Sequence, residues 1–199
     1  MDELFITDVC KVYSQKVVLN NEILVEDLQS SDVASFLKNA FKLLDYQYPK
    51  FFKMDVLSKL TVLASEPILE KQTHKNIALV FMNKSGSLDT DLKHQESIKN
   101  QDTYYPSPAN FVYTLANICL GEVSIKHKLE TENIFFMSET VDANLLYNYA
   151  NYLILHKEVD KVLCGWTEVL GQEYQATLYL VEKKGYVKHT VNEIENIFL

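Results

Sequence analysis

Ile77-Ala78-Leu79-Val80-Phe81-Met82 is an uninterrupted apolar run with polar residues on both sides. A strand or helix with one face in water would interrupt such a run with polar side chains, so the run predicts a strand buried on both faces. Two shorter runs of the same kind follow, at Ile134-Phe135-Phe136-Met137 and at residues 161–164. Helical patterns separate the three runs, and strands alternating with helices are typical of an α/β protein.

The remaining elements are predicted from periodicity and from end signals. Asp32 supplies an N-cap for a helix over residues 33–44, and Asp55 opens a second helix that Pro67 should kink or end early. Further helices are expected at residues 88–99, at 109–126, after Thr140 and at 191–198, and further strands at 5–13, 16–25 and 175–182. The sequence therefore predicts one α/β domain over residues 1–199, with a mixed sheet of about four or five strands and helices on both faces.

Charge and composition exclude several classes of function. The net charge is −8 and all 19 basic residues are lysine, which disfavours nucleic-acid binding because phosphate recognition depends on positive charge and on the guanidinium fork. No apolar run approaches the roughly 20 residues of a membrane-spanning helix. Residues 1–5 lack the basic and apolar regions of a signal peptide, so we expect a cytoplasmic protein.

The sequence contains no pattern for a metal or a cofactor. The five histidines are scattered, and none forms zinc-binding spacing with a cysteine. The five glycines form no phosphate-binding loop. We therefore expect no cofactor and no metal, and we expect three free, mostly buried thiols at Cys10, Cys119 and Cys164.

Four segments, in this order along the chain, resemble the amino-terminal half of a β-ketoacyl synthase, a family with the thiolase fold. Residues 51–55 resemble the approach to an early helix, and residues 106–110 resemble the proline-led start of the helix before the nucleophile strand. Residues 133–138 resemble the strand that holds the nucleophile. Residues 156–168 are similar to the family's charged turn, apolar strand and Gly-Gly-x-Glu motif, with Trp166 in place of the second glycine. Short synthase-like proteins of aryl-polyene or flexirubin-type pathways show the strongest resemblance.

The resemblance implies where a ketosynthase nucleophile would lie. Counting back from Asp160 places it at Thr140, whose neighbours are Ser138 and Glu139, so no cysteine is present there. A threonine hydroxyl would need an adjacent base to act as a nucleophile. We expect Thr140 to be the N-cap of the following helix, with a ligand contact or a covalent role as alternatives. No catalytic residue is assigned.

Other positions follow from the same resemblance. The family's two catalytic histidines belong to a carboxy-terminal half that we expect this protein to lack, and neither His156 nor His189 matches them. Glu168 matches a glutamate with an architectural role. The expected lining of an acyl pocket is Phe136, Met137, Thr140, Cys164 and Trp166, and the lysines considered for carrier-protein docking are Lys50, Lys53 and Lys59.

Three functions remain open at this point. The first is a non-catalytic partner of a full-length ketosynthase, like a chain-length factor, in fatty-acid or polyketide biosynthesis of the aryl-polyene type. The second is an acyltransferase that acts on carrier-bound acyl groups with residues from two chains, and the third is a small acyl-binding homodimer. A lone half of the fold would expose apolar surface, so we expect a homodimer or a heterodimer with a ketosynthase, and acyl carrier protein as a further partner.

Overall fold

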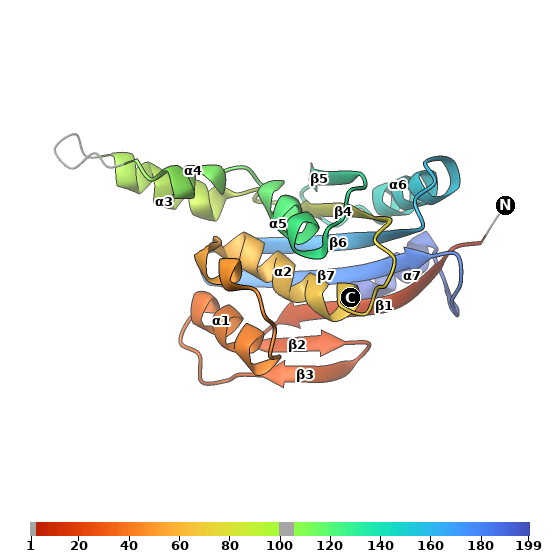
Figure 1. Ribbon diagram of the computed structural model, residues 1–199, viewed down its shortest axis with the longest axis horizontal. Coiled ribbons are helices and arrows are strands. Elements are labelled where there is room, and N and C mark those ends of the chain that lie inside the picture. The colour runs from red at the N-terminus through yellow and green to blue at the C-terminus, as the bar shows by residue number, and fades with distance from the viewer. Residues whose placement is uncertain (1–2, 100–105) are drawn as a thin grey trace.

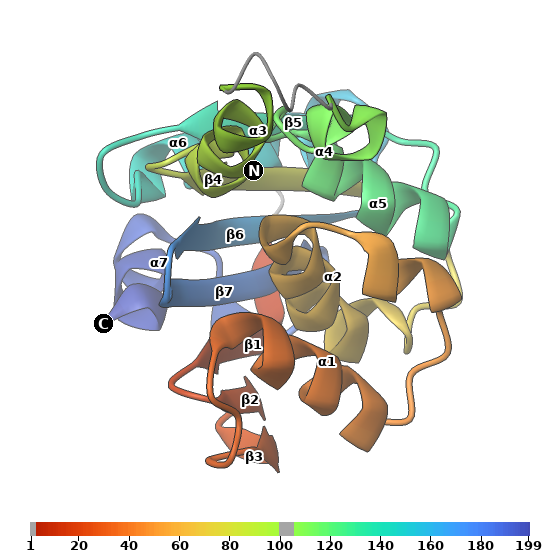
Figure 2. The same cartoon turned by 90° about the vertical axis from the view of Figure 1, so that its left-hand side faces the viewer.

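The fold is built on one mixed β-sheet with helices on both faces (Figure 1 and Figure 2). The computed structural model describes residues 3–99 and 106–199, so Met1 and Asp2, at the start predicted to be leaderless, lie outside the described residues. The strands are β1 (Phe5–Tyr13), β2 (Lys16–Leu19), β3 (Glu22–Glu26), β4 (Ile77–Asn83), β5 (Asn133–Met137), β6 (Lys161–Leu170), β7 (Glu173–Glu182) and β8 (Val187–Lys188). Their order is β3-β2-β1-β7-β6-β4-β5, and β8 pairs with β1.

The α/β class is confirmed, but the predicted number of strands is too low. The sheet has eight strands within the described residues. The amino-terminal hairpin arm forms two separate strands, and β2 pairs antiparallel with β1, so the arm extends the same sheet. β4 pairs parallel with both β5 and β6, while β7 lies antiparallel to β6 through the tight turn at Gly171.

The helices divide between the two faces of the sheet. They are α1 (Val33–Leu43), the 3-10 helix η1 (Pro49–Lys53), α2 (Val56–Leu69), α3 (Leu88–Ile98), α4 (Pro108–Val112), α5 (Ile118–His127), α6 (Ala143–His156) and α7 (Val191–Phe198). Figure 2 shows α1, α2 and α5 on one face and α6 and α7 on the other. α3 and α4 form an arm that extends beyond the sheet in Figure 1.

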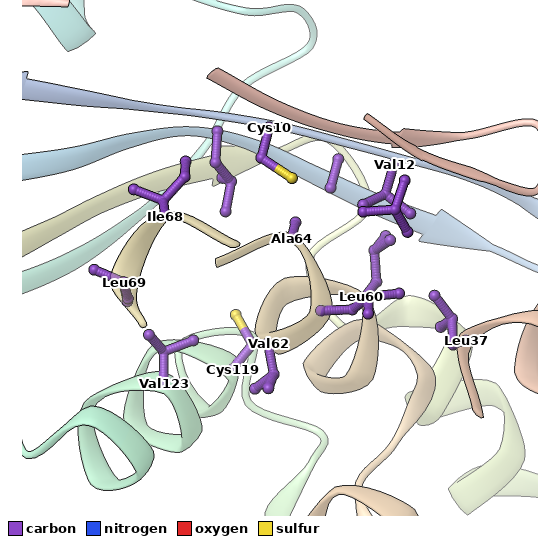
Figure 3. Packing of buried hydrophobic residues seen from close by; sticks show 14 of the residues in the cluster. Cys10, Val12, Leu37, Leu60, Val62, Ala64, Ile68, Leu69, Cys119 and Val123 are labelled. Carbon is purple, nitrogen blue, oxygen red and sulfur yellow. The ribbon is translucent and has the colours of Figure 1, made fainter. Parts of the chain in front are cut away.

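The core confirms the prediction for residues 77–82. Every residue of β4 is buried. Its side chains alternate between a core cluster that includes α2 on one face of the sheet and a cluster that includes α6 on the other face. Helix α2 is buried along most of its length, and Figure 3 shows its side chains Ala64 beneath Cys10 and Leu60 beneath Val12 of β1, with Val62 facing Cys119 of α5. Burial of this kind contributes roughly 1.5–3 kcal/mol for each large apolar side chain.

Two helix predictions are wrong in detail. The single helix expected over residues 109–126 is two helices, α4 and α5, because the chain turns at residues 113–117, where the Tyr113 hydroxyl donates to Glu122 over 2.9 Å. Pro67 does not end α2 early, since the helix continues to Leu69, and the predicted alternative of a kink stays a prediction. A proline so near the end of a helix removes only one backbone hydrogen bond, and the buried packing of the last turn compensates for it.

Candidate functional site

The candidate site lies at the carboxyl ends of β4, β5 and β6. The chain leaves β4 for β5 on one side and then returns to β6 on the other side, which makes this edge the topological switch point of the parallel strands. Crevices at such points are the usual ligand sites of open α/β sheets. Two loops meet there: residues 84–87 after β4, and residues 138–142 after β5.

Glu168 holds the loop after β4. Its Oε2 accepts the backbone N–H groups of Lys84 at 2.7 Å and of Ser85 at 3.1 Å. The loop also closes on itself, because the Gly86 N–H donates to Oδ1 of Asn83 over 2.8 Å. These contacts confirm the architectural role expected for Glu168.

The turn after β5 contains Thr140, where the resemblance predicted the nucleophile position, and residues 138–142 include no cysteine. Ser138 N–H donates to the Asn83 carbonyl over 2.8 Å, and Lys84 Nζ lies 2.5 Å from Glu139 Oε1. Thr140 is exposed, and α6 begins only at Ala143. Glu139, the neighbour considered as a base for the Thr140 hydroxyl, is paired with Lys84 in the described residues.

The predicted N-cap of α6 is wrong. Asp142, not Thr140, caps the helix: its Oδ1 accepts the Leu145 N–H over 2.9 Å. Aspartate is among the strongest N-cap residues, and only Asp142 has the three-residue spacing to a free N–H of the first turn. The predicted N-cap was two residues too early because it was taken from the nucleophile position of the resemblance and not from the spacing between Asp142 and Leu145.

The five residues expected to line an acyl pocket do not gather around one cavity within the described residues. Cys164 and Trp166 are buried in the core beneath α6, and Phe136 packs on the Tyr149 ring at a centroid distance of 5.6 Å. Met137 points to the opposite face of β5 and is 68% exposed, while Thr140 is exposed on the turn. A shared acyl lining formed by these residues stays a prediction.

A different cavity opens beside Met137. It has a volume of about 390 Å³, and its lining comprises residues 85–87, Asp91, residues 114–117, Phe135 and Met137. Sequence reasoning missed Phe135. The alternation of side chains along a strand could have found it, because Phe135 and Met137 must share one face of β5 while Ile134 and Phe136 share the other.

The described residues offer neither a reactive thiol nor a set of metal ligands. All three cysteines are buried and free, as expected; burial raises the pKa of Cys10 and of Cys119 to about 12, and it raises the pKa of Cys164 as well. Within residues 3–99 and 106–199, no group of three or more His, Cys, Asp or Glu side chains could hold a metal ion. None of the described helices combines the length and the apolar character needed to cross a membrane.

One edge of β5 is not paired with another described strand. Leu79 N–H donates to the Glu132 carbonyl, and Ser138 N–H donates to Asn83, so the even-numbered residues of this segment direct their backbone groups toward β4. The odd-numbered residues of β5 must then direct theirs away from the sheet. Among the strands that the structure describes, β5 is the last of the sheet, which leaves the N–H and C=O groups of Asn133, Phe135 and Met137 without a strand partner there.

Several large apolar side chains of the arm and of the carboxyl end of β5 are exposed. We call this set the arm patch: Leu88, Leu92, Phe111, Leu115 and Met137, which are between 41% and 68% exposed. Leu115 and Met137 both line the 390 Å³ cavity, so the patch is continuous with it. An exposed apolar cluster beside an unpaired strand edge is typical of a protein–protein interface.

The three lysines considered for carrier-protein docking differ in exposure. Lys50 and Lys53 are exposed and lie one turn apart on η1, so they project from the same side of this 3-10 helix. Lys59 is only 6% exposed, its amine donates to the Met54 carbonyl, and burial lowers its pKa to about 8. Lys59 therefore cannot take part in a surface docking site.

Comparison with known structures places the fold. The chain is similar to the ishigamide ketosynthase/chain length factor (TM-score 0.68, 17% identity, 90% of this chain and 62% of that one). It is also similar to the complex of the ketosynthase ApeO with its chain length factor ApeC from Xenorhabdus doucetiae (TM-score 0.61, 16% identity, 92% and 80%) and to a β-ketoacyl synthase from Burkholderia phymatum (TM-score 0.65, 13% identity, 92% and 60%). Neither protein-family models nor curated proteins match the sequence.

The chain therefore has the thiolase-like fold of ketosynthases and chain length factors, as the motifs indicated. It spans 62% of the length of the ishigamide protein and 60% of the Burkholderia synthase. At these identities the similarity establishes the fold, and the function rests on the geometry of the site.

Proposed function

We propose that this protein is a cytoplasmic, non-catalytic subunit that pairs with a ketosynthase in fatty-acid or polyketide biosynthesis of the aryl-polyene type, in the manner of a chain-length factor. The observation that carries the proposal is the free edge of β5 beside the arm patch. An unpaired strand bonds an incoming strand through its backbone, and the flanking apolar side chains supply the buried area that a stable pair needs. The similar ApeO–ApeC structure is a ketosynthase in complex with its chain length factor.

The absence of a catalytic set supports the non-catalytic part of the proposal. Condensation needs an activated thiolate, and the turn after β5 offers an exposed hydroxyl and an ion-paired carboxylate instead. The buried cysteines have raised pKa values and remain protonated near neutral pH. Acyl transfer by residues shared between two chains therefore has less support than a partner role.

The arm patch also gives the subunit a way to influence its partner. Phe111 and Leu115 project from the arm, and the cavity beside Met137 is partly apolar. When a ketosynthase strand pairs with β5, these side chains face the partner and limit the space for a growing acyl chain. Lys50 and Lys53 supply a positive surface for the acidic helix of an acyl carrier protein.

The test is strand pairing with a purified ketosynthase from the same source. The Asn133 N–H points away from β4, so Asn133→Pro removes a donor that no described strand uses, and proline is tolerated at the first residue of a strand. We expect Asn133→Pro to weaken the pair by tenfold or more, since it both removes a hydrogen bond and places a ring at the interface. The matched control Asn133→Ala should keep wild-type affinity, and equal affinity for all three proteins would refute pairing through β5.

A small homodimer is the second function with an observation in its favour. If two copies of β5 pair antiparallel about Phe135, Ile134 of one copy lies opposite Phe136 of the other, and both are apolar. Sedimentation of the purified chain decides between the two. A stable homodimer that does not exchange with a ketosynthase, and that carries bound acyl groups, would favour this function over the first.

A further inference from the structure

One buried carboxylate joins two separate surfaces of the molecule. Glu122 of α5 is 4% exposed; its Oε1 accepts the Tyr113 hydroxyl over 2.9 Å, and its Oε2 lies 2.8 Å from Lys50 Nζ. Tyr113 belongs to the turn between α4 and α5, which carries Leu115 of the arm patch. Lys50 belongs to η1, whose outer side carries the positive surface, so Glu122 is a direct link between arm and positive surface.

The outer side of η1 has the composition of a docking surface for an acidic amphipathic helix. Lys53 and Lys42 are exposed, Phe52 is 41% exposed, and Lys42 Nζ lies 5.8 Å above the Phe52 ring. Lys50, which adds a third positive charge, has a side chain that is 44% exposed. Its ammonium group can therefore also reach a carboxylate that binds at the surface, and that carboxylate competes with the buried Glu122 for its three N–H donors.

We infer that Glu122 is a positioning residue that couples occupancy of the η1 surface to the arm patch. An acidic helix bound at η1 draws Lys50 away, and Glu122 then remains buried with only the Tyr113 hydroxyl as partner. An unpaired buried carboxylate is strongly unfavourable, so the turn at Tyr113 loosens until water reaches the carboxylate. The inference rests on the proposed function, since it describes how docking at η1 regulates the interface beside β5.

Within the described residues, Lys50 is the one cation ion-paired with Glu122. Lys126, one turn along α5, is held by Glu66 at 2.7 Å and lies over the Tyr48 ring at 5.2 Å. Lys126 is therefore already committed and cannot replace Lys50 when Lys50 moves. The link between the arm and η1 therefore depends on Lys50. Neighbouring Lys53 differs, because it forms none of the described ion pairs with α5.

The experiment uses the full chain and a synthetic helical peptide rich in Glu and Leu, with a Gln-for-Glu peptide as its negative control. Hydrogen exchange of residues 108–127 reports on the arm, and calorimetry reports on affinity. We expect the acidic peptide to accelerate exchange in the wild type, and Lys50→Ala to accelerate it without any peptide. The matched variant Lys53→Ala should weaken peptide binding and leave exchange unchanged.

Glu122→Gln separates coupling from structural damage. The amide still accepts from Tyr113 but does not hold Lys50, so the variant should bind the acidic peptide roughly three- to tenfold more tightly and show no change in exchange on binding. Damage to the fold would weaken binding instead. If the peptide binds the wild type with unchanged exchange and with the affinity of Glu122→Gln, the coupling is wrong while docking at η1 stands. If the peptide binds neither protein, both the coupling and the proposed carrier-protein surface are wrong, and strand pairing through β5 is untouched.

Discussion

Gly165 lies in the middle of β6, opposite Leu178 of β7, with a φ of +153°. A Cβ atom added there would lie 2.1 Å from the carbonyl oxygen of Thr177 and 2.9 Å from the Cα of Leu178. Both are backbone atoms of a strand that is paired on both sides, so no change of rotamer can relieve the contact. We therefore expect Gly165→Ala to force β6 and β7 apart locally.

The size of the effect follows from two contributions. A backbone conformation that only glycine adopts readily is worth about 1–3 kcal/mol of strain in any other residue. An added methyl group in a close-packed core adds about 1–3 kcal/mol. The free energy of unfolding should then fall by about 2–6 kcal/mol, out of the roughly 5–15 kcal/mol typical of a domain, and the melting temperature by roughly 5–20 °C.

Urea and thermal unfolding followed by circular dichroism measure this difference. Gly121→Ala is the matched control, since Gly121 lies inside α5 and no atom lies within 4 Å of an added Cβ. That control should be neutral or more stable by about 0.5–1 kcal/mol, because alanine favours a helix. A Gly165→Ala protein within about 1 kcal/mol of the wild type would refute the reasoning.

Three further predictions concern buried charges and the turn after β5. Glu66 is 2% exposed and pairs with both Lys126 and His127, so Glu66→Ala should lower the free energy of unfolding by about 3–5 kcal/mol in urea titrations, and a loss below about 1 kcal/mol would contradict this. Burial lowers the pKa of His189 from 6.5 to about 4; because the unfolded chain then binds the proton first, stability is full above about pH 6.5 and falls by at most about 3 kcal/mol as the pH approaches 4. Replacing His189 with Gln should make the urea midpoint depend less on pH between about 4 and 6.5. An unchanged pH dependence would show that other groups cause the loss of stability. Thr140→Ala should leave the turnover of a reconstituted synthase pair unchanged in a product assay, whereas a tenfold loss would give Thr140 a chemical role.

Much of the fold could be predicted because it depends on local pattern. The apolar run from Ile77 to Met82 predicts a strand buried on both faces. The motif that contains Gly165 and Glu168 predicts strand β6 and the glutamate that binds the loop after β4. At the position where the family motif has its second glycine, the Trp166 side chain is buried in the core beneath α6, while Gly165 faces a strand backbone. The alternation on β6 thus explains which glycine of the motif had to be kept.

The remaining features depend on contacts between distant residues. The pairing of β2 with β1, the break between α4 and α5 through Tyr113 and Glu122, and the burial of Lys59 all arise from tertiary packing that no local pattern encodes. Alternation along the strand places Phe135 on the same face as Met137, but it does not show what lies beside that face. The importance of Phe135 depends on β5 being the edge strand, which is a property of the strand order rather than of the sequence around it.

The contacts around the turn after β5 explain how this turn keeps its structure without a nucleophile. Glu168 fixes the loop after β4, Asn83 binds the Ser138 N–H, and Lys84 holds Glu139. These contacts hold the carboxyl end of β5 in register with β4, and this end includes Met137 and its outward-facing backbone groups. The proposed pairing through β5 depends on these contacts, because they position the edge strand, and none of them requires a cysteine in the turn.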